Sequence, residues 1–396
     1  MSTLKITNLQ GPAASSPAIV LASDGTATAQ LSSLNGGALS GARNRIINGD
    51  MRIDQRNAGA AVTFSGAQYT VDRWSCDKNN LSTLVATCQR VADAPAGFNY
   101  SLKTTITTAQ ASSANSSLVS ADQRIEGFNA ASLAFGTASA SSFTISFWVK
   151  ASVTGTYPVS FFNWTGSVVN RAYLATYSIS ASNTWEYKQI TVPGDTSGTW
   201  LTDNQIGLGV QFCTGGGTDA NGTAGSWGST YKPRTSACVD LNATLNATWQ
   251  ITGVQLEAGS VATPFERRSY GQELALCQRY YAKSYQIDTV PGTVTRTGGI
   301  QLGSYSNTAT SMNNGVGFRF PVVMRISPTT TGYDPDAANT TGQGRWDAAG
   351  VAATQGALTL GVIGDAGVGS VTIATTGRTA GDGLTVLFHY TASAEL

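Results

Sequence analysis

Apolar and polar positions alternate along many short segments of this chain. In the segment 143–150, four apolar residues alternate with four others: Phe143, Ile145, Phe147 and Val149 against Thr144, Ser146, Trp148 and Lys150. A period of two places each set on one face of a β-strand, so we predict a strand with one face in a core. Similar strands are predicted at 157–164, 172–179, 185–192, 206–212 and 248–257.

These segments are short and are separated by breaks rich in glycine, asparagine and serine. Parallel βαβ units would need helical crossovers, which the sequence does not offer between 44 and about 258. The fold class predicted for this region is therefore all-β, an antiparallel sandwich of jelly-roll type. No repeat of 20 to 50 residues emerges, which counts against a long β-helix.

The stretch 267–283 departs from this pattern because its apolar residues recur at helical spacing. The stripe consists of Leu274, Cys277, Gln278 and Tyr281, widened by Leu276 and Tyr280. We predict a helix here, inside a connecting segment at 259–283. Beyond it the chain returns to strands near 358–363, 370–374 and 383–391, which predicts a small separate β-domain at 284–396.

The first 43 residues are rich in alanine, serine and glycine, with one strand-like stretch at 18–22. They contain too few apolar residues to build a core of their own. We interpret them as an extended arm that becomes ordered against a partner.

The composition adds to the β prediction and excludes some partners. Only 12% of the residues are charged, against about 25% in an average soluble protein. The formal net charge is +1, so no long-range field attracts nucleic acid or an anionic membrane. No run approaches the length of about 18 apolar residues that a membrane-spanning helix requires, so no membrane insertion is expected.

Several longer motifs occur in order along the chain, beginning with Asn44-Arg-Ile-Ile-Asn-Gly-Asp-Met-Arg-Ile-Asp-Gln-Arg and Tyr69-Thr-Val-Asp-Arg-Trp. These two motifs open a resemblance to a group of bacteriophage tail-fibre and receptor-binding proteins. It continues at Gln123-Arg-Ile-Glu-Gly-Phe-Asn, at Phe143-Thr-Ile-Ser-Phe-Trp-Val-Lys, at Trp249-Gln-Ile-Thr-Gly-Val-Gln-Leu-Glu and at Cys277-Gln-Arg-Tyr-Tyr. The end, from Phe318-Arg-Phe-Pro to His389-Tyr-Thr-Ala-Ser-Ala-Glu-Leu, is more loosely similar to the tip domains of the same family.

This resemblance implies a structural protein of the virion, made in the bacterial cytoplasm, that adheres to a glycan on the host surface. It implies that the arm at 1–43 attaches to other virion proteins of the tail or baseplate. It also implies a homotrimer, and the apolar stripe of the predicted helix is a sensible place for three chains to meet.

More distantly, the region 44–258 resembles jelly-roll carbohydrate-binding modules, in which acidic residues of the last strand often hold a structural calcium. Here Thr252 and Gly253 stand at the matching place, and two of the oxygen ligands that calcium prefers are missing. No cofactor is expected, and a structural calcium stays open but doubtful.

Flat aromatic faces beside polar groups suit sugar recognition, and the chain has eight tryptophans. Trp148 and Lys150 share the polar face of their strand, where Trp148 either offers a sugar platform or packs under a loop. Trp227 lies in a glycine-rich loop, where a ligand or a neighbouring subunit would cover it. Tyr333 and Trp346 are the candidates in the terminal domain. Three other tryptophans are expected to be structural: Trp74, Trp185 and Trp249.

The sequence gives no pattern typical of an enzyme. Glycan cleavage needs two carboxylates across a sugar, and the pair Asp334 and Asp336 lies in a turn context instead. The single histidine, His389, has no serine or cysteine motif to act with. We therefore expect a tail fibre or receptor-binding protein. The alternatives are a capsid-decorating or baseplate protein without a receptor role and, less favoured, a capsular-polysaccharide depolymerase.

Overall fold

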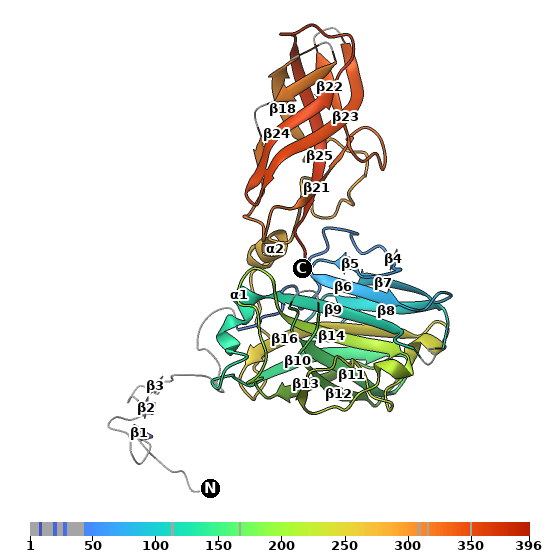
Figure 1. The fold of residues 1–396 in the computed structure, drawn as a ribbon, viewed down its shortest axis with the longest axis vertical. Coiled ribbons are helices and arrows are strands. Elements are labelled where there is room, and N and C mark those ends of the chain that lie inside the picture. Colours follow the sequence, from blue (N-terminus) through green and yellow to red (C-terminus); the bar gives the residue numbers. More distant parts are fainter. Residues whose placement is uncertain are drawn as a thin grey trace.

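The computed structural model describes residues 8–9, 19–21, 27–29 and 43–396, apart from 112–114, 166–167, 307, 309, 315–316 and 349–350. The predicted arm lies almost wholly outside these residues. Its described parts are three short strands that pair in chain order: β1 (Asn8–Leu9), β2 (Ile19–Leu21) and β3 (Ala27–Ala29). The rest forms a broad β-sandwich with an elongated β-domain standing on one end of it (Figure 1).

Two antiparallel sheets build the sandwich. The six-stranded sheet has the order β13-β10-β16-β8-β7-β4 and the seven-stranded sheet the order β15-β12-β11-β14-β9-β6-β5. The strands of the first are β4 (Val62–Thr63), β7 (Val85–Val91), β8 (Ser101–Thr108), β10 (Phe143–Ala151), β13 (Glu186–Val192) and β16 (Thr248–Ala258). Those of the second are β5 (Gln68–Val71), β6 (Trp74–Asn79), β9 (Leu118–Glu126), β11 (Gly155–Phe162), β12 (Ala172–Ile179), β14 (Ile206–Gly216) and β15 (Trp227–Gly228).

The all-β jelly-roll prediction is confirmed. The apolar residues of β10 point into one core between the two sheets, as their alternation predicts, and Trp74 and Trp249 are fully buried in the same core. Six predicted strands correspond to β10, β11, β12, β13, β14 and β16 within a few residues. The early strands β5 to β9 had no counterpart in the prediction.

A second core fills the terminal domain. Its main path is β17-β25-β22-β23-β24-β19, with β18 and β21 also paired to β25 and β20 to β24. The strands are β17 (Tyr281–Lys283), β18 (Ile300–Tyr305), β19 (Ser311–Asn314), β20 (Phe318–Arg319), β21 (Thr329–Tyr333), β22 (Gln343–Ala348), β23 (Val351–Gly364), β24 (Gly367–Ala374) and β25 (Gly383–Ser393). Buried side chains between Ala282 and Ala394 form this core.

Helices are few and short in the described part of the chain. They are α1 (Gly127–Ala130), η1 (Ala131–Leu133), η2 (Thr218–Ala220), η3 (Leu241–Ala243) and α2 (Tyr270–Gln278). The helix predicted at 267–283 is therefore too long. It begins after Ser269, whose side chain accepts from the amide of Gln272, and Tyr281–Lys283 pairs with β25 instead.

The apolar side of α2 is covered by the same chain. Cys277 and Tyr280 are fully buried in a small cluster with Ile47 and Ile53, and Leu274 packs against it. Leu274 and Leu276 are only partly buried, and the meeting of three chains at this stripe stays a prediction.

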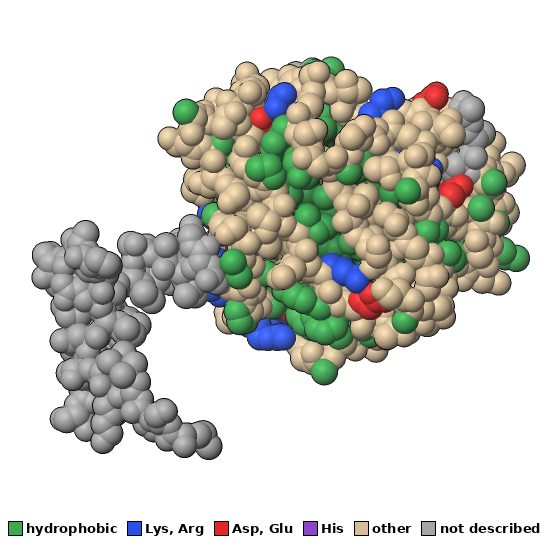
Figure 2. Space-filling view, turned by 90° about the horizontal axis from the view of Figure 1, so that it is seen from below, with side chains coloured by type: hydrophobic (Ala, Val, Ile, Leu, Met, Phe, Trp, Pro, Cys, Tyr) green, Lys and Arg blue, Asp and Glu red, His purple; other side chains and the backbone are tan. Residues whose placement is uncertain are grey.

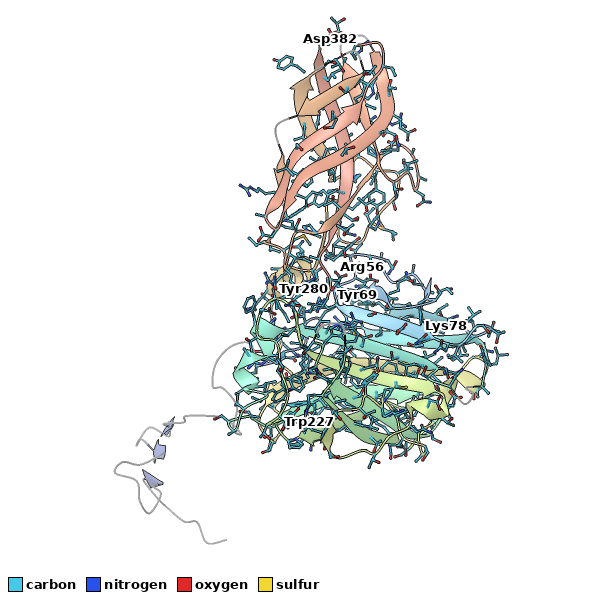
Figure 3. All side chains as sticks on the ribbon, in the orientation of Figure 1. Arg56, Tyr69, Lys78, Trp227, Tyr280 and Asp382 are labelled. Atoms are coloured by element: carbon cyan, nitrogen blue, oxygen red, sulfur yellow. The ribbon has the colours of Figure 1, made fainter. Side chains whose placement is uncertain are left out.

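Buried charges fix the junction between the sandwich and the terminal domain. Arg73, 1% exposed, and Arg56 both pair with the carboxylate of Glu395. Each guanidinium also stacks on a tyrosine, Arg73 over Tyr280 at 3.6 Å and Arg56 over Tyr281 at 3.7 Å from the ring centre. Figure 3 shows Arg56, Tyr69 and Tyr280 at this junction.

A second set of contacts joins α2 to β9. The carboxylate of Glu126 accepts two hydrogen bonds from Arg279, at 2.9 and 2.5 Å, and one from the hydroxyl of Tyr280 at 2.6 Å. Nearby, the amide side chain of Gln123 accepts from the backbone N–H of Ile47 and donates to its carbonyl, both at 2.8 Å. Three of the motifs seen in the sequence, at 44–56, 123–129 and 277–281, thus meet at one place.

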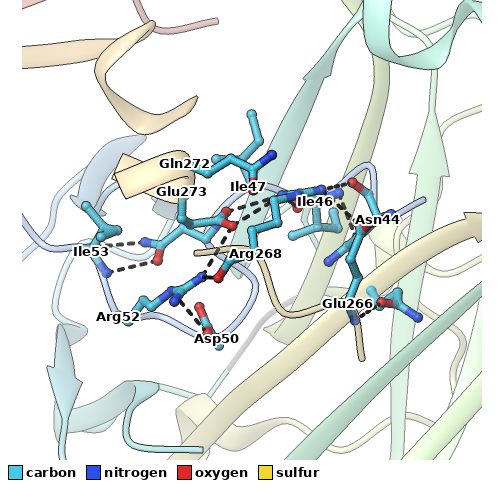
Figure 4. A network of polar contacts seen from close by, with 12 residues as sticks. Asn44, Ile46, Ile47, Asp50, Arg52, Ile53, Glu266, Arg268, Gln272 and Glu273 are labelled. Carbon is cyan, nitrogen blue, oxygen red and sulfur yellow. Dashed lines mark hydrogen bonds and ion pairs between the residues drawn. The ribbon is translucent and has the colours of Figure 1, made fainter. Parts of the chain in front are cut away.

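Arg268 ties the opening motif to the segment before α2 (Figure 4). Its guanidinium donates to the carbonyl oxygens of Asn44 and Ile46 and lies against the carboxylates of Glu266 and Glu273, each at 3.3 Å. Glu266 in turn accepts from the backbone amide of Asn44 at 2.9 Å. Within the described residues no group of three or more His, Cys, Asp or Glu side chains is placed to hold a metal ion.

Replacing Glu395 with glutamine tests the importance of the junction. The change leaves Arg73 buried without its carboxylate, so we expect the free energy of unfolding to fall by about 3 kcal/mol in denaturant titrations. Asp336→Asn is the matched control, because Asp336 pairs with the exposed Arg296 and such pairs contribute about 1 kcal/mol or less. Equal losses for the two variants would contradict the role assigned to Glu395.

Candidate functional site

Trp148 and Lys150 lie on the outer face of the six-stranded sheet, opposite the apolar residues of β10, as the alternation predicts. Trp148 stands directly across from Tyr187 of β13. Their ring centres are 5.5 Å apart, and Tyr187 is 44% exposed. This face therefore presents aromatic rings to solvent on two neighbouring strands.

Lys150 belongs to a polar group at the edge of these rings. Its ammonium pairs with Asp93 and lies 5.0 Å from the ring centre of Trp185, whose Nε1 donates to Asp93 at 3.4 Å. Burial raises the pKa of Asp93, but the hydrogen bond and charge of Lys150 outweigh it and hold that pKa below its usual value. Trp185 was expected to be structural; it lies outside the hydrophobic core, half-buried beside this ion pair.

Two loops extend the line of rings on the other side of Trp148. Phe98 and Phe265 meet edge to face with centres 5.2 Å apart, and Arg267 lies 4.8 Å above the ring of Phe98. We call the five rings the aromatic strip, which consists of Phe265, Phe98, Trp148, Tyr187 and Trp185. Only Trp148 was proposed from the sequence as a ligand residue.

Gly253 makes the close approach of these rings feasible. It lies in β16 where the register with β10 shifts, and its φ is +60°. A Cβ at this position would lie 2.7 Å from Phe98 Cζ and 3.2 Å from Trp148 Cδ1. Gly253, which stands where the carbohydrate-binding modules often carry an acidic residue, thus has a packing role.

Polar groups lie beside the rings as a sugar site requires. The hydroxyl of Thr252, next to Trp148 across the register, is buried without a hydrogen-bond partner among the described residues. Gln250 lies between Lys103 of β8 and Lys150 of β10. Both of these side chains are buried, Thr252 at 0% and Gln250 at 4% exposed. Rings that offer flat apolar faces, with the charged groups of Lys150 and Asp93 at their edge, can bind a sugar by stacking and hydrogen bonding.

Trp227 lies at the opposite end of the sandwich from the terminal domain (Figure 3). Seen from that end, hydrophobic side chains form a band across the middle of the surface (Figure 2). Trp227 contacts the rings of Phe135, Trp200 and Tyr173, and its Nε1 donates to the carbonyl of Pro193 at 2.7 Å. Its own chain therefore provides the cover that was expected from a ligand or a subunit.

The two candidates of the terminal domain do not form a platform. Trp346 is 2% exposed and belongs to the second core, and its role as a ligand residue stays a prediction. Tyr333 is half-buried; its ring contacts Tyr285 and its hydroxyl lies 3.4 Å from that of Thr391. The structure does not bring either residue near Trp148 or Trp227.

The side chains considered for catalysis are engaged in structural contacts. His389 is fully buried and stacked on Tyr285, with Nδ1 2.8 Å from the hydroxyl of Ser284 and Nε2 2.9 Å from the carbonyl of Thr295. Burial lowers the pKa of His389. Asp334 accepts from Arg345 at 2.9 Å, and Asp336 pairs with Arg296.

The outer face of the seven-stranded sheet carries a row of polar residues across four strands: Ser75, Asp122, Gln211 and Ser160. Asp122 is only 3% exposed, and burial raises its pKa to about 6. The hydroxyl of Tyr231, from the loop after β15, donates to Gln211. This row is covered, whereas the aromatic strip is open to solvent.

No family model and no curated protein matches this chain. Solved structures that it resembles include the enzymatically active domain of tailspike protein 4 from bacteriophage CBA120, at 14% identity over 58% of this chain and a TM-score of 0.31. The chain spans 23% of that tailspike chain. Another is a family 11 carbohydrate-binding module from Clostridium thermocellum, at 10% identity over 51% of this chain and 98% of that one, with a TM-score of 0.28. Likenesses at these scores carry no inference about this chain.

The described helices are all short. No helix in the described part of the chain is long and apolar enough to cross a membrane.

Gly253→Ala is expected to disturb the aromatic strip. The new methyl group meets Phe98 and needs a positive φ, so the free energy of unfolding should fall by about 2 kcal/mol, and the tryptophan fluorescence of the folded state should change. Gly66→Ala is the control, since no atom lies within 4 Å of its added Cβ and its φ is not positive. A wild-type stability for Gly253→Ala would contradict this packing.

Through Asp122, the free energy of unfolding should depend on pH. The sign is opposite to that of a carboxylate whose pKa is lowered by an ion pair. Its pKa in the folded protein, about 6, lies above the ordinary value of 3.8, so the folded state binds the proton more tightly. The stabilisation is greatest below about pH 4 and is lost as the pH rises to about 6, by on the order of 2 kcal/mol. Across this range the free energy of unfolding of the wild type should fall by that amount relative to that of Asp122→Asn, as measured by denaturant titrations. Parallel curves would show that Asp122 titrates normally.

Proposed function

We propose that this chain is a bacteriophage tail-fibre or receptor-binding protein that adheres to a host-surface glycan through the aromatic strip. The observation that carries the proposal is two ring pairs on an otherwise polar sheet face, Phe98 with Phe265 and Trp148 with Tyr187, with Tyr187 exposed and Trp185, Lys150 and Asp93 at their edge. The sequence motifs that resemble such fibre proteins supply the virion assignment.

The arrangement suits a ligand with many hydroxyl groups and flat apolar faces. Exposed aromatic surface costs free energy unless something covers it, and a sugar ring covers an aromatic face while its hydroxyls meet the surrounding polar groups. Contacts of this kind are individually weak. Several copies on one particle raise the overall affinity by roughly 10² to 10⁴ without any new contact.

The remaining parts of the proposal concern assembly. The arm at 1–43 attaches the protein to other virion proteins, and three copies form the fibre. Leu274 and Leu276 of α2 are only partly buried within the chain, so this helix stays the proposed place for the three chains to meet. A monomeric mass for the full-length protein in solution would remove the trimer from the proposal.

We further propose that the protein binds its glycan without cleaving it. A glycosidase site needs two carboxylates on either side of a sugar. Of the carboxylates described at the edge of the strip, Asp93 already pairs with Lys150.

Replacing Trp148 or Tyr187 with alanine tests the site. Loss of either stacking face should weaken binding of the purified protein to host cells and to their extracted polysaccharide about tenfold, or about 1.4 kcal/mol. Phe128→Ala is the control, because Phe128 is 61% exposed on α1, away from the strip.

Sugar release should be followed in the same tubes. Binding without release, lost in Trp148→Ala and kept in Phe128→Ala, is the expected result. Unchanged binding by both strip variants would place the receptor site elsewhere, and release of sugar would identify a depolymerase.

A further inference from the structure

We propose that the aromatic strip selects glycans that carry negative charge, in the form of carboxylate or phosphate groups. This inference rests on the proposed function and adds the chemical class of the ligand. It comes from an imbalance between cations and carboxylates on the open face of the six-stranded sheet.

Two lysines form a row on this face. Lys103 of β8 stands beside Gln250 of β16, and Gln250 stands beside Lys150 of β10. Lys150 pairs with Asp93, whereas no carboxylate among the described residues lies within ion-pair distance of Lys103. Lys103 is partly exposed, and its charge next to the rings is not neutralised by an ion pair among the described residues.

A third cation lies at the other end of the strip. Arg267 is exposed and stacked on Phe98, and its Nη2 donates to the carbonyl of Gly97 at 2.6 Å. It makes no ion pair within the described residues. The charge of Arg267 acts to lower the pKa of Asp50, but the carboxylate of Asp50 is paired with Arg52 at 3.3 Å. Most of the guanidinium donors of Arg267 remain available to a ligand, in the planar arrangement that suits carboxylate and phosphate.

The positive charge is local. The whole chain carries 24 basic and 23 acidic residues, so it has almost no net charge. Along the strip, Lys103 and Arg267 make no ion pair among the described residues and Lys150 pairs with Asp93. At the Arg267 end, the carboxylates of Asp50 and Glu266 pair with Arg52 and Arg268. The covered face of the other sheet has the opposite balance, with Asp77 and Asp122 near Arg124.

An anionic group near these cations gains from each of them. Opposite charges attract at this range even near a protein surface, and salt screens the attraction strongly. A neutral glycan gains only the stacking and hydrogen bonding. The account therefore predicts both a preference among glycans and a marked salt dependence.

The test uses the full-length protein and a panel of purified bacterial surface polysaccharides in three arms: neutral, uronic-acid-bearing and phosphate-bearing. Binding is measured at about 50 mM and about 500 mM NaCl. For each acidic polysaccharide that binds, a chemically neutralised form is compared, made by carboxyl reduction or by removal of the phosphate. The variants are Lys103→Ala with Arg267→Ala and, as the matched control, Arg319→Ala, an exposed cation of the terminal domain.

The expected result is binding to acidic polysaccharides that falls at least tenfold in high salt, in the double variant and after neutralisation, and that Arg319→Ala leaves unchanged. The two acidic arms tell which group is recognised. Saturable binding to neutral polysaccharides alone, insensitive to salt and to the double variant, would overturn the charge preference while leaving glycan adhesion standing. Failure of the folded protein to bind either any polysaccharide or host cells would overturn the proposed function itself.

Discussion

The architecture depends on keeping buried charges paired where the two β-domains meet. A guanidinium taken out of water is tolerated only when carboxylates, carbonyl oxygens and aromatic faces replace its hydration. Arg73 pairs with Glu395, donates to the carbonyl of Arg124 at 2.5 Å and stacks on the ring of Tyr280. Because these partners come from both domains, displacing one domain from the other would leave charges unpaired. The ion pairs and hydrogen bonds therefore fix the orientation of one domain against the other more specifically than an apolar contact would.

This constraint gives a physical role to the motifs that carry the family resemblance. Asn48 donates to the carbonyls of Ile53 and Asp72 and accepts from the indole N–H of Trp74 through its own carbonyl. Glu126 holds Arg279 and Tyr280, and Arg268 holds the opening segment. These residues form the junction, and their side chains are engaged in its contacts. The proposed recognition surface, the aromatic strip, lies outside these contacts, although Trp148 and Lys150 belong to another of the motifs.

The sequence predicted those strands in which one face is buried and the other is exposed to solvent. Strand β10 shows this alternation plainly. Strand β9 does not, because its outer residues, including Ser120 and Asp122, are buried beneath a loop as well. The helix was predicted too long because Tyr280 and Tyr281 fit its apolar spacing, while burial and pairing with β25 place Tyr281 in a strand.

The candidate site was only partly within reach of sequence reasoning. The face of Trp148 and Lys150 followed from alternation, but Phe98 and Arg267 lie on loops, and only the fold brings them beside β10. Trp185 comes just before β13, where nothing in the pattern tells an exposed ring from a buried one. Trp346 illustrates the reverse, since a tryptophan flanked by Arg345 and Asp347 proves to be core.

Hydrogen–deuterium exchange of the full-length protein, with and without a polysaccharide that it binds, tests the central claim most directly. The account predicts that binding slows exchange in the segments 93–100 and 184–191 and at 264–268, which border the strip, and leaves the junction segments unchanged. Protection confined to the loop around Tyr231 or to the terminal domain would contradict it and would place the recognition surface there.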